Sequence, residues 1–254
     1  MSLAKEIDPY KDDQKDVLFP TEELYSDEPP LESDLHLEQM NLLIDCLKLW
    51  WENRNDFYAA GNLTIYFSPQ QLKNEDFRGP DFFVVLDTDN LHRDSWVVWQ
   101  ENGKYPNIIV ELLSPSTAST DRGLKKEIYQ DIFQTPEYFW FSPKNLEFAG
   151  FILINGKYQP IESNSQGWLW SQQLNLYLGI HENQLRYFTP EGELVPTYQE
   201  LADQRQQNIE QEKQRADEAQ LYAEQEKQRA DEAVAELKAL KAKLRELNID
   251  PNSL

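Results

Sequence analysis

The chain has one cysteine, three histidines and no long apolar run. Cys46 alone excludes an intrachain disulfide and a cysteine-based zinc cluster. The histidines are scattered without the spacing of metal ligands. No stretch approaches the roughly 18 apolar residues that a membrane span requires, and the first residues are acidic instead of basic and then apolar. These absences predict a cytoplasmic protein with no membrane partner.

Positive charge is also scarce. Lys and Arg number 24 against 45 Asp and Glu, which gives a net charge of −21. The net charges of residues 1–35, 36–199 and 200–254 are −8, −9 and −4, so every part is acidic. Long-range attraction to a polyanion is therefore absent, and DNA contact would require a local basic patch. One candidate patch consists of Arg78, Arg122, Lys125 and Lys126.

Composition and charge divide the chain into parts. With 254 residues, 40% hydrophobic and 12% aromatic, it can bury one good core and carry appendages. Residues 1–33 mix charges with prolines, which predicts an acidic, mobile N-terminal segment. Residues 34–199 are expected to form one domain, residues 200–248 a helical tail and residues 249–254 the C-terminal end.

The order of elements indicates an α/β fold. Ser33 and Asp34 are plausible N-caps for an amphipathic helix that ends near Asn53. Strands are expected at 63–67, 82–86, 108–113 and 138–141, with a helix between Thr120 and Pro136 on which Leu124, Ile128 and Ile132 form one stripe. Asn155-Gly156 predicts a later hairpin. We expect a mixed sheet flanked by helices.

An acidic residue interrupts the most apolar of these strands. Glu111 lies in the run Ile-Ile-Val-Glu-Leu-Leu at 108–113, which is typical of a strand buried on both faces. An ionised carboxylate buried without a partner costs several kcal/mol or more. A cation, a metal or strong hydrogen-bond donors must therefore compensate Glu111. A structural ion pair with Arg78 or Arg122 is the alternative to a functional role.

Two further residues indicate a catalytic site. Asp81 opens the apolar strand at 82–86, and Lys125 follows on the predicted helix. Asp81 and Glu111 are suited to hold Mg²⁺ or Mn²⁺, with the Leu112 backbone carbonyl as a third oxygen ligand. An ammonium group beside the metal would orient an attacking hydroxide and stabilise developing negative charge. Tyr129, one helical turn after Lys125, could contact a phosphate.

Four motifs occur between residues 79 and 138: Gly79-Pro80-Asp81; Ile-Val-Glu-Leu-Leu-Ser-Pro-Ser-Thr at 109–117; Asp121-Arg122 with Lys125 and Tyr129; and Pro136-Glu137-Tyr138. Together they resemble the Uma-type restriction endonucleases, a bacterial branch of the PD-(D/E)XK nuclease superfamily, over about residues 36–195. The resemblance implies a restriction-endonuclease-like core and a metal-dependent DNA endonuclease. Asp81 and Glu111 match the metal-binding acids, and Lys125 matches the lysine.

The chain departs from the superfamily pattern at one position. Leu113 stands where the Glu-X-Lys element has its lysine, so the lysine must come from the following helix. Lys125 is preferred over Lys126 by its spacing to Tyr129, but both remain candidates. The alternative function is a catalytically inactive nuclease fold that acts as an interaction or scaffold module through the tail.

The tail contains an internal repeat. QEKQRADEA at 211–219 recurs at 225–233, and this 14-residue period equals two heptads. The a and d positions carry mostly alanine until Leu237, Leu240, Leu244 and Leu247. A parallel homodimer through residues 237–247 is therefore predicted, with Glu236 and Lys241 placed for an interhelical ion pair. A single solvated helix is the alternative.

Overall fold

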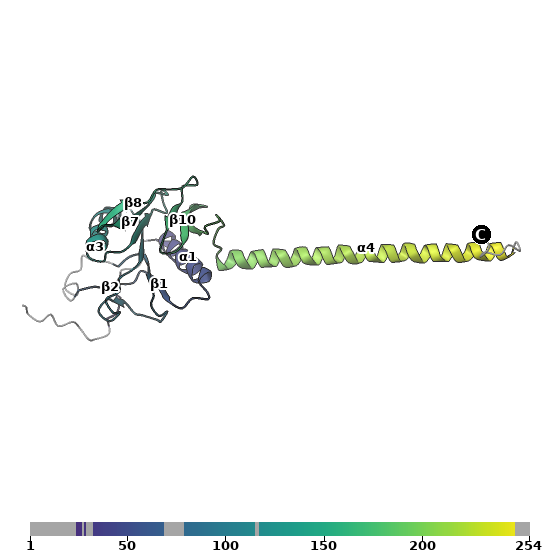
Figure 1. Cartoon of the computed structure of the whole chain (residues 1–254), viewed down its shortest axis with the longest axis horizontal. Coiled ribbons are helices and arrows are strands. Elements are labelled where there is room, and N and C mark those ends of the chain that lie inside the picture. The colour runs from purple at the N-terminus through teal and green to yellow at the C-terminus, as the bar shows by residue number, and fades with distance from the viewer. Residues whose placement is uncertain (1–23, 27, 29–32, 69–78, 115–116, 247–254) are drawn as a thin grey trace, which may run out of the picture. The chain divides into compact units, whose positions relative to one another are not determined.

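The computed structural model describes residues 24–26, 28, 33–68, 79–114 and 117–246. Its internal contacts divide the chain into two compact units, Met1–Tyr198 and Gln199–Leu254 (Figure 1). The elements of the first unit are α1 (Asp34–Trp50), β1 (Phe57–Gly61), β2 (Ile65–Tyr66), β3 (Phe82–Leu86), β4 (Trp96–Val97), β5 (Ile108–Leu112), α2 (Ala118–Thr120), the π-helical turn η2 (Asp121–Lys125), α3 (Lys126–Asp131), β6 (Glu137–Phe141), β7 (Phe148–Ile154), β8 (Lys157–Pro160), β9 (Leu169–Ser171), β10 (Leu176–His181) and β11 (Gln184–Phe188).

The predicted mixed sheet is confirmed. Six strands pair in the order β1-β3-β5-β6-β7-β8, and β5 runs parallel to β6 while the other neighbours are antiparallel. Asn155-Gly156 forms the turn between β7 and β8, as its sequence indicates. β1 is not among the predicted strands, because its Phe-Tyr-Ala-Ala-Gly sequence includes residues that strands disfavour. A second sheet has the order β11-β10-β9.

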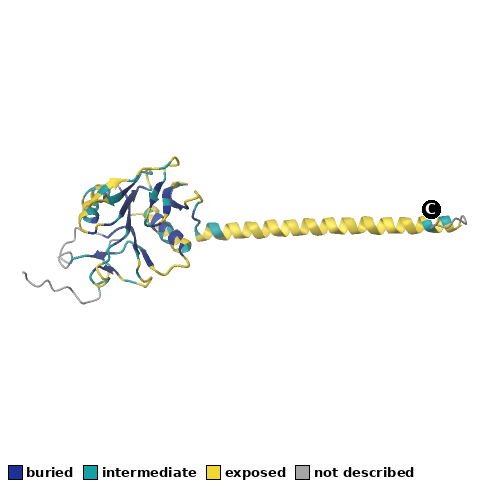
Figure 2. Ribbon diagram, viewed as in Figure 1, coloured by how far each residue is buried: buried dark blue, intermediate teal, exposed yellow. Residues whose placement is uncertain are grey.

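Both faces of the six-stranded sheet are covered, so its central strands appear buried in Figure 2. On one face, α1 and the β9–β11 sheet pack over Phe82, Val110 and Phe139. On the other, Tyr129 and Phe133 pack with Ile109 and Tyr138. Every residue of β5 is buried, as its apolar sequence predicts. Because side chains alternate along a strand, Glu111 lies on the face that α3 covers.

The helical region after Thr117 differs from the predicted single helix in two ways. It consists of α2, the turn η2 and α3, and it turns a different face toward the sheet than its apolar stripe indicates. Leu124 and Ile132 are each 49% exposed, whereas Asp121 and Tyr129 are buried. The stripe prediction holds for Ile128, which packs against the core, and was wrong for Leu124 and Ile132. The polar residues compensate Glu111, which outweighs the burial of these two aliphatic side chains.

Part of the N-terminal segment contacts the domain. The Ser26 backbone N–H donates to the Asp94 carbonyl at 2.9 Å, and the Tyr66 hydroxyl donates to the Tyr25 carbonyl at 2.9 Å. The Glu28 carboxylate accepts from the Gly79 backbone N–H and from the Thr64 hydroxyl. These contacts differ from the mobile segment expected over residues 1–33, because pairing of an extended backbone does not require an apolar sequence.

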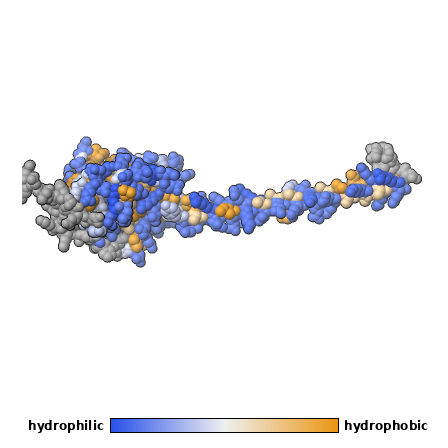
Figure 3. Space-filling view, turned by 90° about the horizontal axis from the view of Figure 1, so that it is seen from below, coloured by the Kyte–Doolittle hydropathy of each residue, from blue (hydrophilic) through white to orange (hydrophobic). Residues whose placement is uncertain are grey.

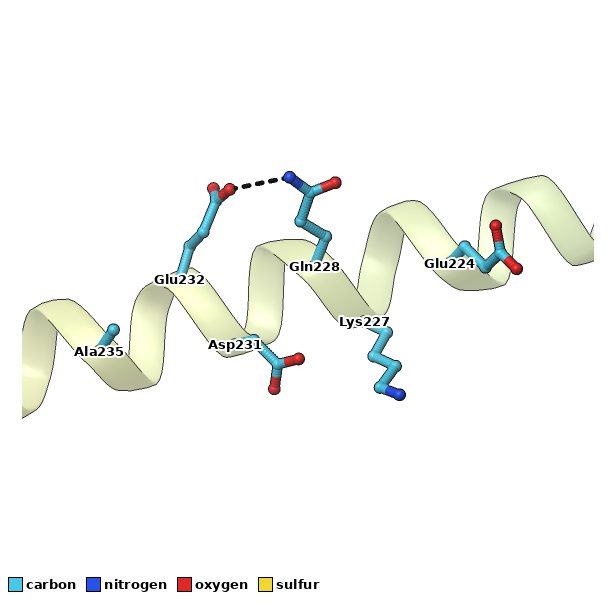
Figure 4. A pocket seen from close by; sticks show the side chains of 6 residues that line it. All are labelled: Glu224, Lys227, Gln228, Asp231, Glu232 and Ala235. Carbon is cyan, nitrogen blue, oxygen red and sulfur yellow. Dashed lines mark hydrogen bonds between the residues drawn. The ribbon is translucent and has the colours of Figure 1, made fainter.

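The second unit contains one long helix, α4 (Tyr198–Glu246), of 49 residues. None of its described residues is buried, and its surface is mainly hydrophilic with scattered apolar side chains (Figure 3). Figure 4 shows one stretch, in which the Gln228 side chain donates to Glu232 at 3.2 Å. Both lie outside the predicted a and d positions. No helix among the described residues is long and apolar enough to cross a membrane.

The predicted homodimer interface includes exposed leucines of α4. Leu237 and Leu240 are 53% and 57% exposed, so burying them against a second copy would stabilise a pair of helices. Removing residues 202–254 should leave the first unit folded with an unchanged unfolding midpoint and should convert a weak dimer into a monomer. Sedimentation velocity over a range of concentrations measures this.

A matched pair of variants separates the seam from general hydrophobicity. Replacing Leu237 and Leu240 with serine should weaken association, whereas replacing the equally exposed Leu221 and Val234, which lie outside the a and d positions, should not. Equal loss in both variants would contradict the proposed register. A dimer that survives truncation would place the interface on the first unit.

Candidate active site

The two predicted acids face each other across neighbouring strands. The register of β3 and β5 pairs Phe82 with Val110, so Asp81 and Glu111 follow as the next opposed pair. The Asp81 backbone N–H lies 3.4 Å from Glu111 Oε2, and Asp81 Oδ2 accepts from the Leu112 backbone N–H at 2.7 Å. Strand pairing thus holds both carboxyl groups at one end of β3 and β5.

Glu111 is fully buried and has two close donors. Lys125 Nζ lies 3.0 Å from Glu111 Oε2, and the Tyr129 hydroxyl donates to Oε1 at 2.6 Å. Lys125 also reaches the Gly79 carbonyl at 3.4 Å. The compensation that the sequence demands therefore comes from a lysine and a tyrosine one helical turn apart. The alternative of a buried arginine partner does not occur among the described residues.

Asp121 is a third acid at this site, and it is not among the residues predicted to be functional. Its side chain is 1% exposed, and Oδ1 lies 3.2 Å from Lys125 Nζ. The Tyr138 hydroxyl donates to the Asp121 backbone carbonyl at 2.8 Å and so anchors the start of η2. The spacing of Asp121, Lys125 and Tyr129 at four-residue intervals was the available signal.

The π-helical turn aligns these three side chains. In an α-helix, each step of four residues advances about 40° beyond a full turn, so positions i and i+8 diverge. The wider π turn over Asp121–Lys125 offsets part of this drift. Asp121, Lys125 and Tyr129 consequently all face the sheet, which explains why a polar stripe is buried beneath an exposed Leu124.

Burial dominates the electrostatics of the acids. Desolvation, followed by the charge of Asp81, raises the pKa of Glu111 to about 8 against the opposing effect of Lys125. Burial and the charge of Glu111 raise the pKa of Asp121 to about 6. Burial also raises the pKa of Asp81. For Lys125, burial disfavours the ammonium, but the surrounding acids outweigh it, and its pKa is raised above the ordinary value.

The backbone carbonyl of Leu112, the expected third metal ligand, contacts His36. His36 lies in the first turn of α1, where the Ser33 side chain caps the helix. Its Nε2 donates to the Leu112 carbonyl at 3.0 Å, and its Nδ1 lies 2.8 Å from Ser33 Oγ. His36 thus ties α1 to the strand that carries Glu111. A carbonyl oxygen has two lone pairs, so one remains for another ligand.

The predicted substrate-binding residues lie in different surroundings. Arg122 is surface-exposed and pairs with Glu147 at 2.6 Å. Lys126 Nζ lies 3.3 Å from the Phe151 ring centroid and 5.3 Å from that of Trp140, a cation–π arrangement. Arg78 lies outside the described residues. Of the three described members of the expected basic patch, only Lys125 forms ion pairs with the acids.

Tyr129 also differs from its expected role. Its side chain is fully buried and its hydroxyl is committed to Glu111. Because this hydroxyl donates to Glu111, the structure places Tyr129 where it orients the carboxylate of Glu111. The sequence identified the correct helical face but not the depth of the side chain.

The acidic residues at this site outnumber the basic ones, so their charge suits the binding of one divalent cation. Asp81, Glu111 and Asp121 face the single ammonium of Lys125, and neither carboxylate oxygen of Asp121 receives a well-oriented hydrogen bond from the described residues. No group of three or more His, Cys, Asp or Glu side chains in the described ranges is arranged as a metal site. Mg²⁺ commonly uses only one or two carboxylates and completes its shell with water and phosphate.

The chain belongs to the family described as "Uma2: Putative restriction endonuclease", whose model matches residues 7–183. This confirms the resemblance seen in the motifs. No curated protein matches the chain. A solved structure titled "Crystal structure of a putative nuclease belonging to DUF820 from Anabaena variabilis ATCC 29413" is similar, with 11% identity over 58% of this chain and 76% of that one and a TM-score of 0.42.

The raised pKa of Glu111 predicts a pH-dependent stability of the metal-free protein. Because the folded-state pKa of about 8 exceeds the ordinary value of 4.5, the stabilisation is complete below about pH 4.5, falls as the unfolded group loses its proton above that value, and is gone once the pH has risen through 8. Above about pH 6, where Asp121 contributes less, the free energy of unfolding should fall by up to about 1.4 kcal/mol per pH unit.

Urea unfolding at several pH values between about 6 and 8 measures this slope, which should level off above pH 8, where both the folded and the unfolded group are deprotonated. Glu111→Gln cannot titrate and serves as the control, so its stability should change much less over the same range. Parallel profiles for the two proteins would show that Glu111 ionises normally in the folded state.

Proposed function

We propose that this protein is a metal-dependent endonuclease that hydrolyses phosphodiester bonds in DNA. The observation that supports this most directly is the opposition of Asp81 and Glu111 on paired strands, with Lys125 3.0 Å from Glu111. Two acids and a lysine are the residue types that metal-assisted phosphodiester hydrolysis requires. Membership of a family described as restriction endonucleases agrees with this chemistry.

Each residue has a distinct task in this proposal. Asp81 and Glu111 would bind Mg²⁺ or Mn²⁺, with the Leu112 carbonyl as a further oxygen ligand. The bound cation supplies the means to lower the pKa of a water and to polarise the scissile phosphate. Lys125 would orient the attacking hydroxide and stabilise negative charge on the phosphate. Tyr129 holds the Glu111 carboxylate in one orientation.

The charge distribution limits how DNA could bind. Arg122 is paired with Glu147, and Lys126 lies against aromatic rings, so neither adds a free positive charge beside the acids. Without a bound cation, the ionised acids of this cluster would repel a phosphate. DNA affinity should therefore depend on divalent cations and remain weak in their absence.

The alternative is a nuclease fold without activity that recruits a partner through α4. The exposed helix and the net charge of −21 favour it. Under this alternative, Lys125 and Tyr129 would serve only to neutralise a buried acid, as in any structural ion pair. The two functions differ in whether Asp81 and Glu111 share a metal ion.

Manganese binding distinguishes them. Calorimetric titration of Mn²⁺ into wild type should reveal one or two sites, and Glu111→Gln should weaken binding by at least about tenfold because the amide removes charge while keeping size. Glu147→Gln removes an exposed acid and should bind Mn²⁺ as wild type does. Equal affinity of wild type and Glu111→Gln would refute the metal site.

Cleavage of plasmid DNA in Mg²⁺ or Mn²⁺ tests the lysine. Lys125→Ala should reduce cleavage by about 100-fold or more while retaining Mn²⁺ binding, because lysine acts on water and phosphate. Lys126→Ala is the matched control, since its side chain packs on Phe151 and Trp140, and it should remain active. The opposite pattern would reassign the role to Lys126, and activity in both variants would exclude a catalytic lysine.

A further inference from the structure

Lys125 forms ion pairs with two acids, Glu111 and Asp121. Its Nζ lies 3.0 Å from Glu111, a proposed metal ligand, and 3.2 Å from Asp121, which belongs to its own helical region. Lys125 is 11% exposed and Asp121 is 1% exposed, so water screens neither contact well. The ammonium is therefore shared between a residue with a proposed role and a residue with none.

The position of Asp121 is strongly determined by the fold. The hydroxyl of Tyr138, on the central strand β6, donates to the Asp121 carbonyl at 2.8 Å. The π-helical turn then directs the carboxylate toward Lys125. Neither of its oxygens receives a well-oriented hydrogen bond from the described residues, although both are buried. A buried carboxylate with few hydrogen bonds destabilises the folded protein unless a nearby cation compensates its charge, and the Lys125 ammonium is that cation.

Binding of a divalent cation would change the balance between the two acids. Once Glu111 donates its electron pairs to a cation, it attracts the Lys125 ammonium less, and the cation itself repels the ammonium. Asp121 is then the acid that still attracts Lys125. Without it, the flexible side chain of Lys125 would lose its position when the site is loaded.

We propose that Asp121 is a positioning residue that holds the Lys125 ammonium beside the site when Asp81 and Glu111 bind a divalent cation. This inference rests on the proposed function. It assigns Asp121 to Lys125 and not to the metal, because the ion pair of Asp121 in the described part of the chain is with the lysine, at 3.2 Å. It also explains the π-helical turn, because that turn aligns Asp121 with Lys125.

The reactivity of Lys125 toward reductive methylation tests the proposal in the full-length protein, with Lys126 on the same peptide as the internal reference. In wild type with saturating Mn²⁺, Lys125 should stay protected. In Asp121→Asn with Mn²⁺, its methylation rate should rise by about tenfold, the equivalent of one lost charged hydrogen bond. Asp121→Glu should restore most of the protection. Continued protection in Asp121→Asn would overturn the proposal.

A second pair of variants tests the same role without metal. Glu111→Gln imitates a Glu111 whose charge has been neutralised, so Lys125 should remain protected in Glu111→Gln and become reactive in Glu111→Gln/Asp121→Asn. Exposure of Lys125 in Glu111→Gln alone would overturn the proposal. If wild type binds no Mn²⁺, the proposed function fails, and this metal-free comparison still decides the role of Asp121.

Titration of Mn²⁺ into variants that lack Lys125 tests whether Asp121 binds the metal directly. If Asp121 acts only through Lys125, then Asp121→Asn should leave the Mn²⁺ dissociation constant of Lys125→Met within about twofold. A further tenfold weakening would make Asp121 a metal ligand and overturn the positioning role. Thermal unfolding of each variant confirms that the compared proteins are folded.

Discussion

The structure of the first unit depends on the compensation of one buried carboxylate. Glu111 lies in the middle of the six-stranded sheet, where desolvation of its charge would be prohibitive without donors. Lys125 and Tyr129 provide those donors from the helical region that crosses this face. The face that α3 presents, the π-helical turn before it and the exposure of Leu124 all follow from bringing these two groups to Glu111.

The compensation is incomplete, which distinguishes this site from an ordinary buried ion pair. Asp81 is opposite Glu111 and Asp121 is beside Lys125, so three acids share one ammonium. Elsewhere the fold shows how a buried acid is satisfied fully: Glu137 accepts from the Ser171 hydroxyl and from the backbone N–H groups of Gln172 and Gln173. Among the residues that the structure describes, no such set of neutral donors surrounds Asp121. The excess negative charge is thus specific to the end of β3 and β5.

The sequence predicted those parts of the fold whose signals are local. Glu111 stands out because it interrupts an apolar strand, and α1 is recognisable from its cap and its periodicity. The stripe of Leu124 and Ile132 misled because helix orientation depends on what the opposite surface requires, and that surface comes from β5, a different segment of the chain. For the same reason, the contacts of Asp121 and His36 could not be predicted from the sequence, because their partners are defined only after the helices pack on the sheet.

Global and local charge have different consequences for this protein. At physiological salt the Debye length is about 8 Å, so surface acids far from the site are screened from an approaching ligand. The buried acids are screened much less, because protein and not water surrounds them. The chemistry at Asp81 and Glu111 is therefore set by the few groups within contact distance and not by the net charge of −21. The net charge instead governs encounter with a polyanion, so the proposed hydrolysis at this site is compatible with the acidic surface of the chain.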